Sequence, residues 1–167
     1  MNPRQVLKNY FGYDNFRPLQ AEIIGHVLAK KDALVLMPTG GGKSVCFQIP
    51  AIVFEGLTVV ISPLIALMKD QVEALGANGI EAAYLNSTLN SQEQEEIVSK
   101  ARTGELKLLY IAPEKLFGID ASRLLESLNI SLFAIDEAHC ISSWGHDFRP
   151  EYRKLSGLRK SYPDVPI

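Results

Sequence analysis

Two short stretches contain residue types whose spacing could do chemistry: MPTGGGKS, residues 37–44, and DEAH, residues 136–139. In the first, an apolar run ends in a glycine-rich turn that is followed by a lysine and a serine. Such a turn can aim backbone N–H groups at phosphates, while the lysine reaches the outer phosphates and the serine hydroxyl ligates Mg²⁺. The residues predicted to contact the nucleotide are Thr39, Gly40, Gly41, Gly42, Lys43 and Ser44.

Met37 departs from the common phosphate-loop pattern G-x-x-x-x-G-K-[ST], which has glycine at that position. The position ends the preceding strand and performs none of the tasks listed for the loop. The alternative is a glycine-rich turn that only connects a strand to a helix. The Gly-Lys-Ser triplet after an apolar strand favours the nucleotide site despite the missing glycine.

Asp136 and Glu137 follow a second apolar strand, at the end where ligands bind in open α/β sheets. We predict that Asp136 holds Mg²⁺ and that Glu137 orients and deprotonates the attacking water. The alternative is a solvent-exposed Asp-Glu pair at the end of a strand. Together with the lysine loop, the pair indicates hydrolysis of ATP rather than transfer to a small acceptor.

The elements that must position these residues form a repeating pattern. Five short segments are apolar on both faces, which predicts buried parallel strands at 33–37, 57–62, 82–85, 106–111 and 130–136. Helical segments lie between them. One is expected to begin at Ser62-Pro63 and to end near Gly79, and another to begin at Asn90 or Ser91 with a capping box. The pattern predicts an α/β fold with a mostly parallel sheet and helices on both faces.

Composition limits the other possibilities. The chain has 167 residues, 47% of them hydrophobic, which suits one packed domain. A net charge of -2 gives no general sign of nucleic-acid binding, so any such surface must be local. Cys46 and Cys140 lack metal-type spacing, and the apolar runs are short. We expect an intracellular, soluble protein with no membrane partner and no disulfide-linked partner.

Two further segments give the chain a family resemblance. FGYDNFRPLQ (11–20) and CISSWGHDFRPEY (140–152), together with the two nucleotide motifs, resemble the first motor domain of RecQ-family DNA helicases in the second helicase superfamily. In that superfamily the first loop position need not be glycine, which accounts for Met37. The resemblance implies a RecA-like P-loop domain.

The resemblance assigns the 11–20 segment to adenine recognition. Tyr13 and Arg17 are expected to sandwich the base, and Gln20 to hydrogen-bond its edge. Without the resemblance, this segment could be a helix start whose aromatic residues Phe11 and Phe16 belong to the core.

The resemblance also implies a path for DNA. Segments 62–71 and 112–116 would line it, with Asn86 as a weaker addition, and the aromatic-rich loop 140–152 would couple DNA to ATP hydrolysis. Alternatively, the aromatics anchor a surface loop. The predicted DNA-contacting or coupling residues are Ser62, Pro63, Asn86, Trp144, His146, Phe148 and Arg149, and the catalytic set is Lys43, Asp136, Glu137 and His139.

The resemblance implies that this chain is part of a larger protein. Its cofactors would be ATP and Mg²⁺, and its partners single-stranded or partially duplex DNA and a second motor domain in cis. We expect residues 1–167 to be a truncated first motor domain with little activity alone, acting in 3′ to 5′ translocation and unwinding. It would work in the cytoplasm or nucleoid of a bacterium, or in a eukaryotic nucleus. An RNA-directed helicase and an ATP-gated protein-binding module remain as alternatives.

Overall fold

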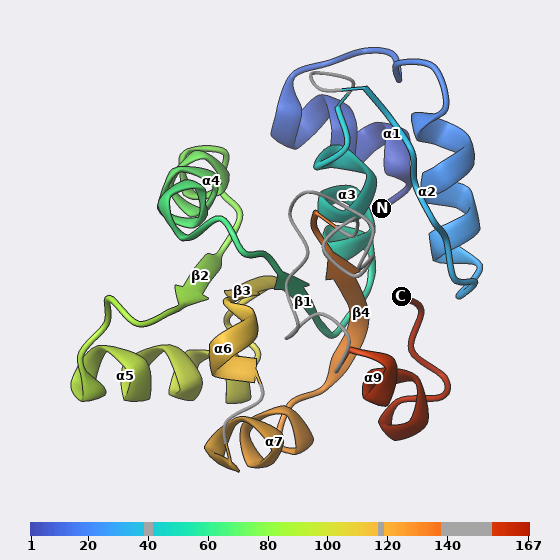
Figure 1. The fold of residues 1–167 in the computed structure, drawn as a ribbon. Coiled ribbons are helices and arrows are strands. Elements are labelled where there is room, and N and C mark those ends of the chain that lie inside the picture. The colour runs from blue at the N-terminus through green and yellow to red at the C-terminus, as the bar shows by residue number, and fades with distance from the viewer. Residues whose placement is uncertain (39–41, 117–118, 138–154) are drawn as a thin grey trace.

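A four-stranded parallel sheet forms the centre of the protein (Figure 1). The structure, a computed structural model, describes residues 1–38, 42–116, 119–137 and 155–167, with only the backbone of 119–122. The strands are β1 (Leu57–Ile61), β2 (Ala82–Leu85), β3 (Leu108–Ile111) and β4 (Ile130–Ile135), in the order β2-β3-β1-β4. Four of the five predicted strands are therefore confirmed, with ends that shift by up to two residues.

The central strands β1 and β3 are buried along their whole length, because helices cover both faces of the sheet. The pairing is in register from Thr58 onward, so that Val60 lies between Tyr110 of β3 and Ala134 of β4. The predicted mostly parallel sheet with helices on both faces is confirmed.

One face of the sheet packs against α3 (Val45–Val53) and α4 (Ile65–Ala77). The N-terminal helices α1 (Pro3–Val6), the π-helix η1 (Leu7–Phe11) and α2 (Gln20–Leu28) pack on the outer side of α3 (Figure 1). Phe11 and Phe16 are partly buried there. The segment predicted to recognise adenine is thereby attached to the helix that begins at the phosphate loop.

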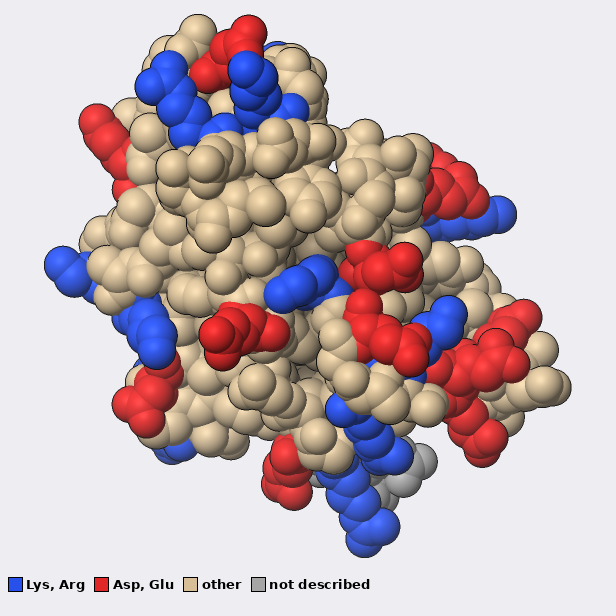
Figure 2. Space-filling model, turned by 180° about the vertical axis from the view of Figure 1, so that it is seen from behind, with Lys and Arg blue, Asp and Glu red and all other residues tan. Residues whose placement is uncertain are grey.

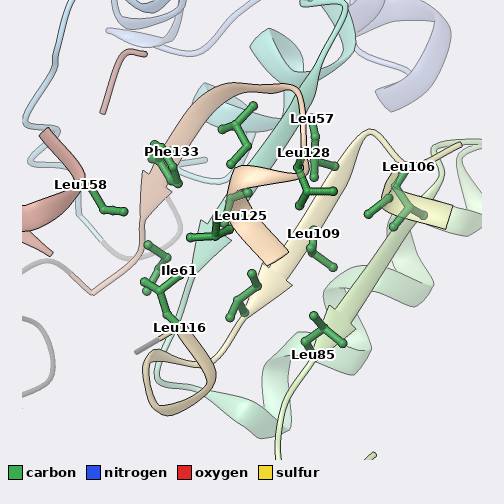
Figure 3. Packing of buried hydrophobic residues seen from close by; sticks show 14 of the residues in the cluster. Leu57, Ile61, Leu85, Leu106, Leu109, Leu116, Leu125, Leu128, Phe133 and Leu158 are labelled. Carbon is green, nitrogen blue, oxygen red and sulfur yellow. The ribbon is translucent and has the colours of Figure 1, made fainter. Parts of the chain in front are cut away.

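The opposite face packs against α5 (Ser91–Arg102), α6 (Pro113–Leu116), α7 (Ile119–Glu126) and α9 (Ser156–Ser161). Leucine side chains fill most of this layer, as Figure 3 shows. Phe133 is fully buried and its ring meets Tyr162 edge-on, with centroids 5.1 Å apart. No helix within the described ranges has both the length and the apolar character to cross a bilayer.

The N-termini of α4 and α5 can be compared with the helix starts predicted from the sequence. Asn90 accepts the N–H of Glu93, whose side chain accepts the N–H of Asn90, so the predicted capping box of α5 is confirmed. The prediction that a helix begins at Ser62-Pro63 is wrong, because that helix, α4, begins at Ile65. The Ser62 hydroxyl instead accepts the Leu64 N–H at 3.3 Å and closes a turn before the helix.

The predicted buried strand at 33–37 is also wrong. Leu34 and Leu36 are 78% and 83% exposed, and the segment has no strand pairing. The end of the chain lies between this segment and β4, since Phe133 donates to the Pro166 carbonyl and Ala33 to the Ile167 carbonyl. Asp32 Oδ1 holds that end in place: it is 2.6 Å from Arg159 Nη2 and accepts the Ile167 N–H at 3.0 Å. A strand forms only where a neighbour offers a ladder of hydrogen bonds, and here residues 34–37 have none.

Candidate nucleotide-binding site

A cavity of about 360 Å³ opens between the N-terminal segment and the start of α3. Its walls come from two stretches of sequence that are separated by more than twenty residues. The lining residues are Leu7, Tyr13, Asn15, Arg17, Gln20, Gly42, Lys43, Ser44 and Val45. The structure therefore brings together six residues that the sequence predicted for nucleotide binding.

The adenine side of the cavity is shaped by the end of the π-helix. Gly12 adopts φ 76°, which glycine tolerates, and its N–H donates to the Lys8 carbonyl at 3.1 Å. Arg4 then holds the following loop, because its guanidinium donates to Asn15 Oδ1 at 2.7 Å. Tyr13 remains 56% exposed, so that its ring offers a face on which a planar base could stack.

Gln20 connects the adenine side to the phosphate loop. Its side chain is only 4% exposed, its Oε1 accepts the Arg17 N–H at 2.8 Å, and its Nε2 donates to the Gly42 carbonyl at 3.1 Å. Both ends of the amide are thus engaged within the protein. A hydrogen bond to a base edge would use the remaining amide hydrogen or lone pair, or replace one of these bonds.

Gly42 must be glycine for two reasons. Its φ is +83°, and a Cβ at this position would overlap the side-chain nitrogen of Gln20. Lys43 is exposed next to it, and the half-buried Ser44 is the N-cap residue of α3. The start of α3 can therefore present an ammonium group, a hydroxyl and the backbone amides ahead of Cys46 to phosphate oxygens, since the Cys46 and Phe47 N–H groups donate to the Lys43 and Ser44 carbonyls.

The carboxylates stand at the carboxyl end of β4. The Asp136 N–H donates to the Ile61 carbonyl at 2.9 Å, which continues the pairing with β1 past the end of the strand. Glu137 takes φ 56°, and its N–H donates to Asp136 Oδ1 at 3.0 Å. A glutamate in this conformation costs about 1–2 kcal/mol, and such strain is concentrated at functional sites. Both residues are half-buried and lie outside the wall of the 360 Å³ cavity.

The donor set suits magnesium. Ser44 and Asp136 supply hard oxygen atoms, which Mg²⁺ prefers, and Mg²⁺ is usually held by one or two protein ligands together with substrate phosphates. Among the described residues, no three His, Cys, Asp or Glu side chains group as a metal cage. This chemistry fits a metal that arrives with a nucleotide, with Ser44 and Asp136 as its protein ligands.

Burial affects the one described cysteine beneath the loop. Cys46 lies in the first turn of α3, and its Sγ is 3.8 Å from the Gly42 carbonyl. Burial raises the pKa of this thiol, so it remains protonated and packs as a small apolar side chain.

The residues predicted to contact DNA have a mixed outcome. Ser62 and Asn86 are 5% and 1% exposed, and Asn86 Oδ1 accepts the Thr88 N–H at 2.9 Å. Pro63 is also buried. These side chains lie in the turns that follow β1 and β2, and their contacts with DNA stay predictions. His139, Trp144, His146, Phe148 and Arg149 lie outside the described residues, as do Thr39, Gly40 and Gly41, and their roles stay predictions.

Surface charge adds no general sign of DNA binding on one side of the molecule. Figure 2 shows blue and red side chains interspersed over that face, without a continuous basic stripe. A nucleic-acid surface normally gathers lysine and arginine on one face.

Sequence reasoning missed three lining residues of the cavity: Leu7, Asn15 and Val45. Leu7 and Val45 carry no chemical signature, because apolar residues at helical spacing usually indicate core. Asn15 lies between Tyr13 and Arg17, which were predicted to contact the base, and only this position in the sequence could have indicated that it lines the cavity.

Comparison with known proteins shows the family of this chain. A sequence model of the family described as DEAD/DEAH box helicase matches residues 17–166. The chain belongs to this family. The resemblance to RecQ proteins is also confirmed: the chain is 56% identical over 162 residues to the ATP-dependent DNA helicase RecQ of Haemophilus influenzae, and 53% over 165 residues to that of Bacillus subtilis.

The chain spans about a quarter of those relatives. The matches cover 97% and 98% of this chain but 26% and 28% of the two RecQ proteins. A solved structure described as a hypothetical ATP-dependent RNA helicase from Sulfolobus tokodaii has a TM-score of 0.72 and 19% identity. It matches 99% of this chain and 49% of its own. The DUF1998 helicase MrfA matches with a TM-score of 0.71 and 18% identity, over 99% of this chain and 28% of its own. These two structures confirm the helicase RecA-like fold.

Proposed function

We propose that this chain is the ATP-binding half of a DNA-dependent ATPase that unwinds duplex DNA. The observation that carries the proposal is that Tyr13, Arg17 and Gln20 line the same cavity as Lys43 and Ser44. A site for a planar base thus adjoins a site for phosphates. The relatives named ATP-dependent DNA helicase RecQ support ATP as the nucleotide and DNA as the partner.

In the proposed mechanism, the residues of this chain position ATP and the attacking water. Tyr13 and Arg17 stack on the adenine, while Lys43 and the amides at the start of α3 hold the outer phosphates. Mg²⁺, held by Ser44 and Asp136, would supply charge stabilisation at the phosphates. Glu137 accepts the proton of the attacking water, with His139 beside it in the sequence completing the catalytic set.

DNA would be sensed by the loop 140–152. Trp144 and Phe148 are suited to stack on unpaired bases, and Arg149 to pair with phosphate. We propose translocation in the 3′ to 5′ direction by a longer polypeptide whose second motor domain completes the ATP site. A missing arginine finger lowers the rate of phosphoryl transfer by about 10³ to 10⁵, so residues 1–167 alone should turn over slowly. The longer protein would act where DNA is: in the bacterial cytoplasm or nucleoid, or in a nucleus.

The first experiment measures nucleotide binding by the chain itself. A fluorescent ATP analogue is titrated with and without Mg²⁺ against the unsubstituted chain, Arg17→Ala and Lys43→Ala. We expect both variants to bind about tenfold or more weakly, because each loses a charged or stacking contact. The matched control is Arg123→Ala, an exposed arginine on α7 over the opposite face of the sheet. Equal binding by Arg17→Ala and Arg123→Ala would contradict the assigned base site.

The second experiment distinguishes DNA from RNA and from protein partners. ATP hydrolysis is measured on a chain extended to the length of its relatives, with single-stranded DNA, single-stranded RNA or neither, and with Trp144→Ala. Strong stimulation by DNA that is lost in Trp144→Ala supports the proposal. Equal stimulation by RNA would favour an RNA-directed helicase, and no stimulation by either would favour an ATP-gated protein-binding module.

A further inference from the structure

A buried polar pair lies behind the candidate site and is not explained by the cavity. Gln48 on α3 is 7% exposed and Tyr110 on β3 is 1% exposed, and Gln48 Nε2 is 3.4 Å from the Tyr110 hydroxyl oxygen. Polar groups are costly to bury, so a pair that spans 62 residues of sequence within an apolar layer requires a reason.

Gln48 is tied directly to the start of α3. Its N–H donates to the Ser44 carbonyl at 2.9 Å, so the two residues are one helical turn apart. A contact that fixes Gln48 against the sheet therefore also fixes the turn that carries Ser44.

Tyr110 shares a face of the sheet with Asp136. Tyr110, Val60 and Ala134 form one row across β3, β1 and β4. Asp136 is two residues beyond Ala134, and side chains two apart in an extended chain point to the same side. The backbones are about 10 Å apart across two strand spacings and about 7 Å apart along the strand. A tyrosine side chain that leans toward α3, which packs against β4, covers part of that distance.

The hydrogen-bond direction follows from the chemistry of the amide. Gln48 Nε2 can only donate, so the phenol oxygen of Tyr110 accepts and its O–H remains available to donate elsewhere. Burial is the main cause that raises the pKa of Tyr110 to about 12. The hydrogen bond from Gln48 lowers this pKa, and the negative charge of Asp136 raises it. The phenol therefore keeps its proton near neutral pH.

We propose that Tyr110, held by Gln48, is a positioning residue that fixes the turn carrying Ser44 for magnesium-dependent nucleotide binding. This inference rests on the proposed function of the same site. Groups behind metal ligands orient them, and their loss typically weakens metal affinity by about 10-fold or more. If Tyr110 only filled the core, removal of its hydroxyl would change stability and leave the magnesium dependence intact.

The test separates these roles by measuring binding rather than turnover. A fluorescent ATP analogue is titrated into the chain in excess Mg²⁺ and in EDTA, and the Mg²⁺ concentration that gives half-maximal binding is determined. For Tyr110→Phe we expect EDTA affinity within about twofold of the unsubstituted chain and a Mg²⁺ requirement raised about 10-fold. Gln48→Leu should shift the Mg²⁺ requirement in the same direction, and the double variant no further than the larger single effect.

The matched control is Tyr84→Phe. Tyr84 pairs with Tyr110 in register and lies on the same face, but β2 is the edge strand farthest from β4. It should leave the Mg²⁺ requirement unchanged. An unchanged requirement in folded Tyr110→Phe, or equal weakening in Mg²⁺ and in EDTA, overturns this inference alone. No nucleotide binding by the unsubstituted chain overturns the proposed function and this inference with it.

Discussion

Alkaline unfolding provides a sharp test of how Tyr110 is buried. The pKa of Tyr110 is raised from 10.0 to about 12 in the folded protein, so the unfolded chain loses this proton first as the pH rises. The resulting stability is fully present below pH 10 and is lost as the pH rises toward 12. The full contribution is about 3 kcal/mol, and roughly half of it is gone by pH 11.

The assay compares the unsubstituted chain with Tyr110→Phe by urea unfolding at pH 8 and pH 11, followed by far-UV circular dichroism. Loss of the hydroxyl leaves Gln48 without its partner at every pH, so that cost cancels when the two pH values are subtracted. We expect the unsubstituted chain to lose roughly 1 kcal/mol more than the variant between the two pH values. Identical losses in both proteins would refute the assignment of Tyr110 as a buried, protonated phenol.

Three stability predictions follow from single residues. Phe133→Ala should lower the free energy of unfolding by about 3–5 kcal/mol, because Phe133 is 0% exposed and its ring meets Tyr162 edge-on; a loss below about 1 kcal/mol in urea unfolding would contradict this. Thr58→Val should be neutral or stabilising by up to about 1 kcal/mol, since the buried hydroxyl finds no partner among the described residues; clear destabilisation would argue for a hidden bond. Lys30→Gly should raise the free energy of unfolding by about 0.5–1 kcal/mol, because Lys30 follows the C-cap of α2 at φ 59° in a Schellman turn; no gain in urea unfolding would contradict this.

Local signals in the sequence predicted much of the fold. Short runs that are apolar on both faces located β1, β2, β3 and β4, because strands covered by helices on both sides need no polar face. The Asn90 and Glu93 spacing predicted the start of α5 correctly, since both hydrogen bonds of a capping box form within four residues. Features that depend on a few neighbouring residues could therefore be predicted from the sequence.

For polar residues at the ends of strands, the residue type left open which neighbouring group each side chain would bond. Asn86 looked like a polar residue available after a strand, but its neighbours enclose it and Thr88 uses its oxygen. Ser62 had the residue type of a helix cap but closes an earlier turn. Side-chain type alone does not reveal which partner a polar group will find.

The sequence by itself determined the chemistry of this protein: a glycine-rich turn before Lys43 and Ser44, and a carboxylate pair after an apolar strand. These follow from residue types and short spacings, which are fixed before the chain folds. Only the tertiary structure decided that Gln20 bonds the Gly42 carbonyl, and that residues 34–37 pair with no strand in the described part of the chain. Both outcomes depend on which segments from distant parts of the sequence lie next to each other. Packing of the folded chain decides this, and the local sequence pattern does not.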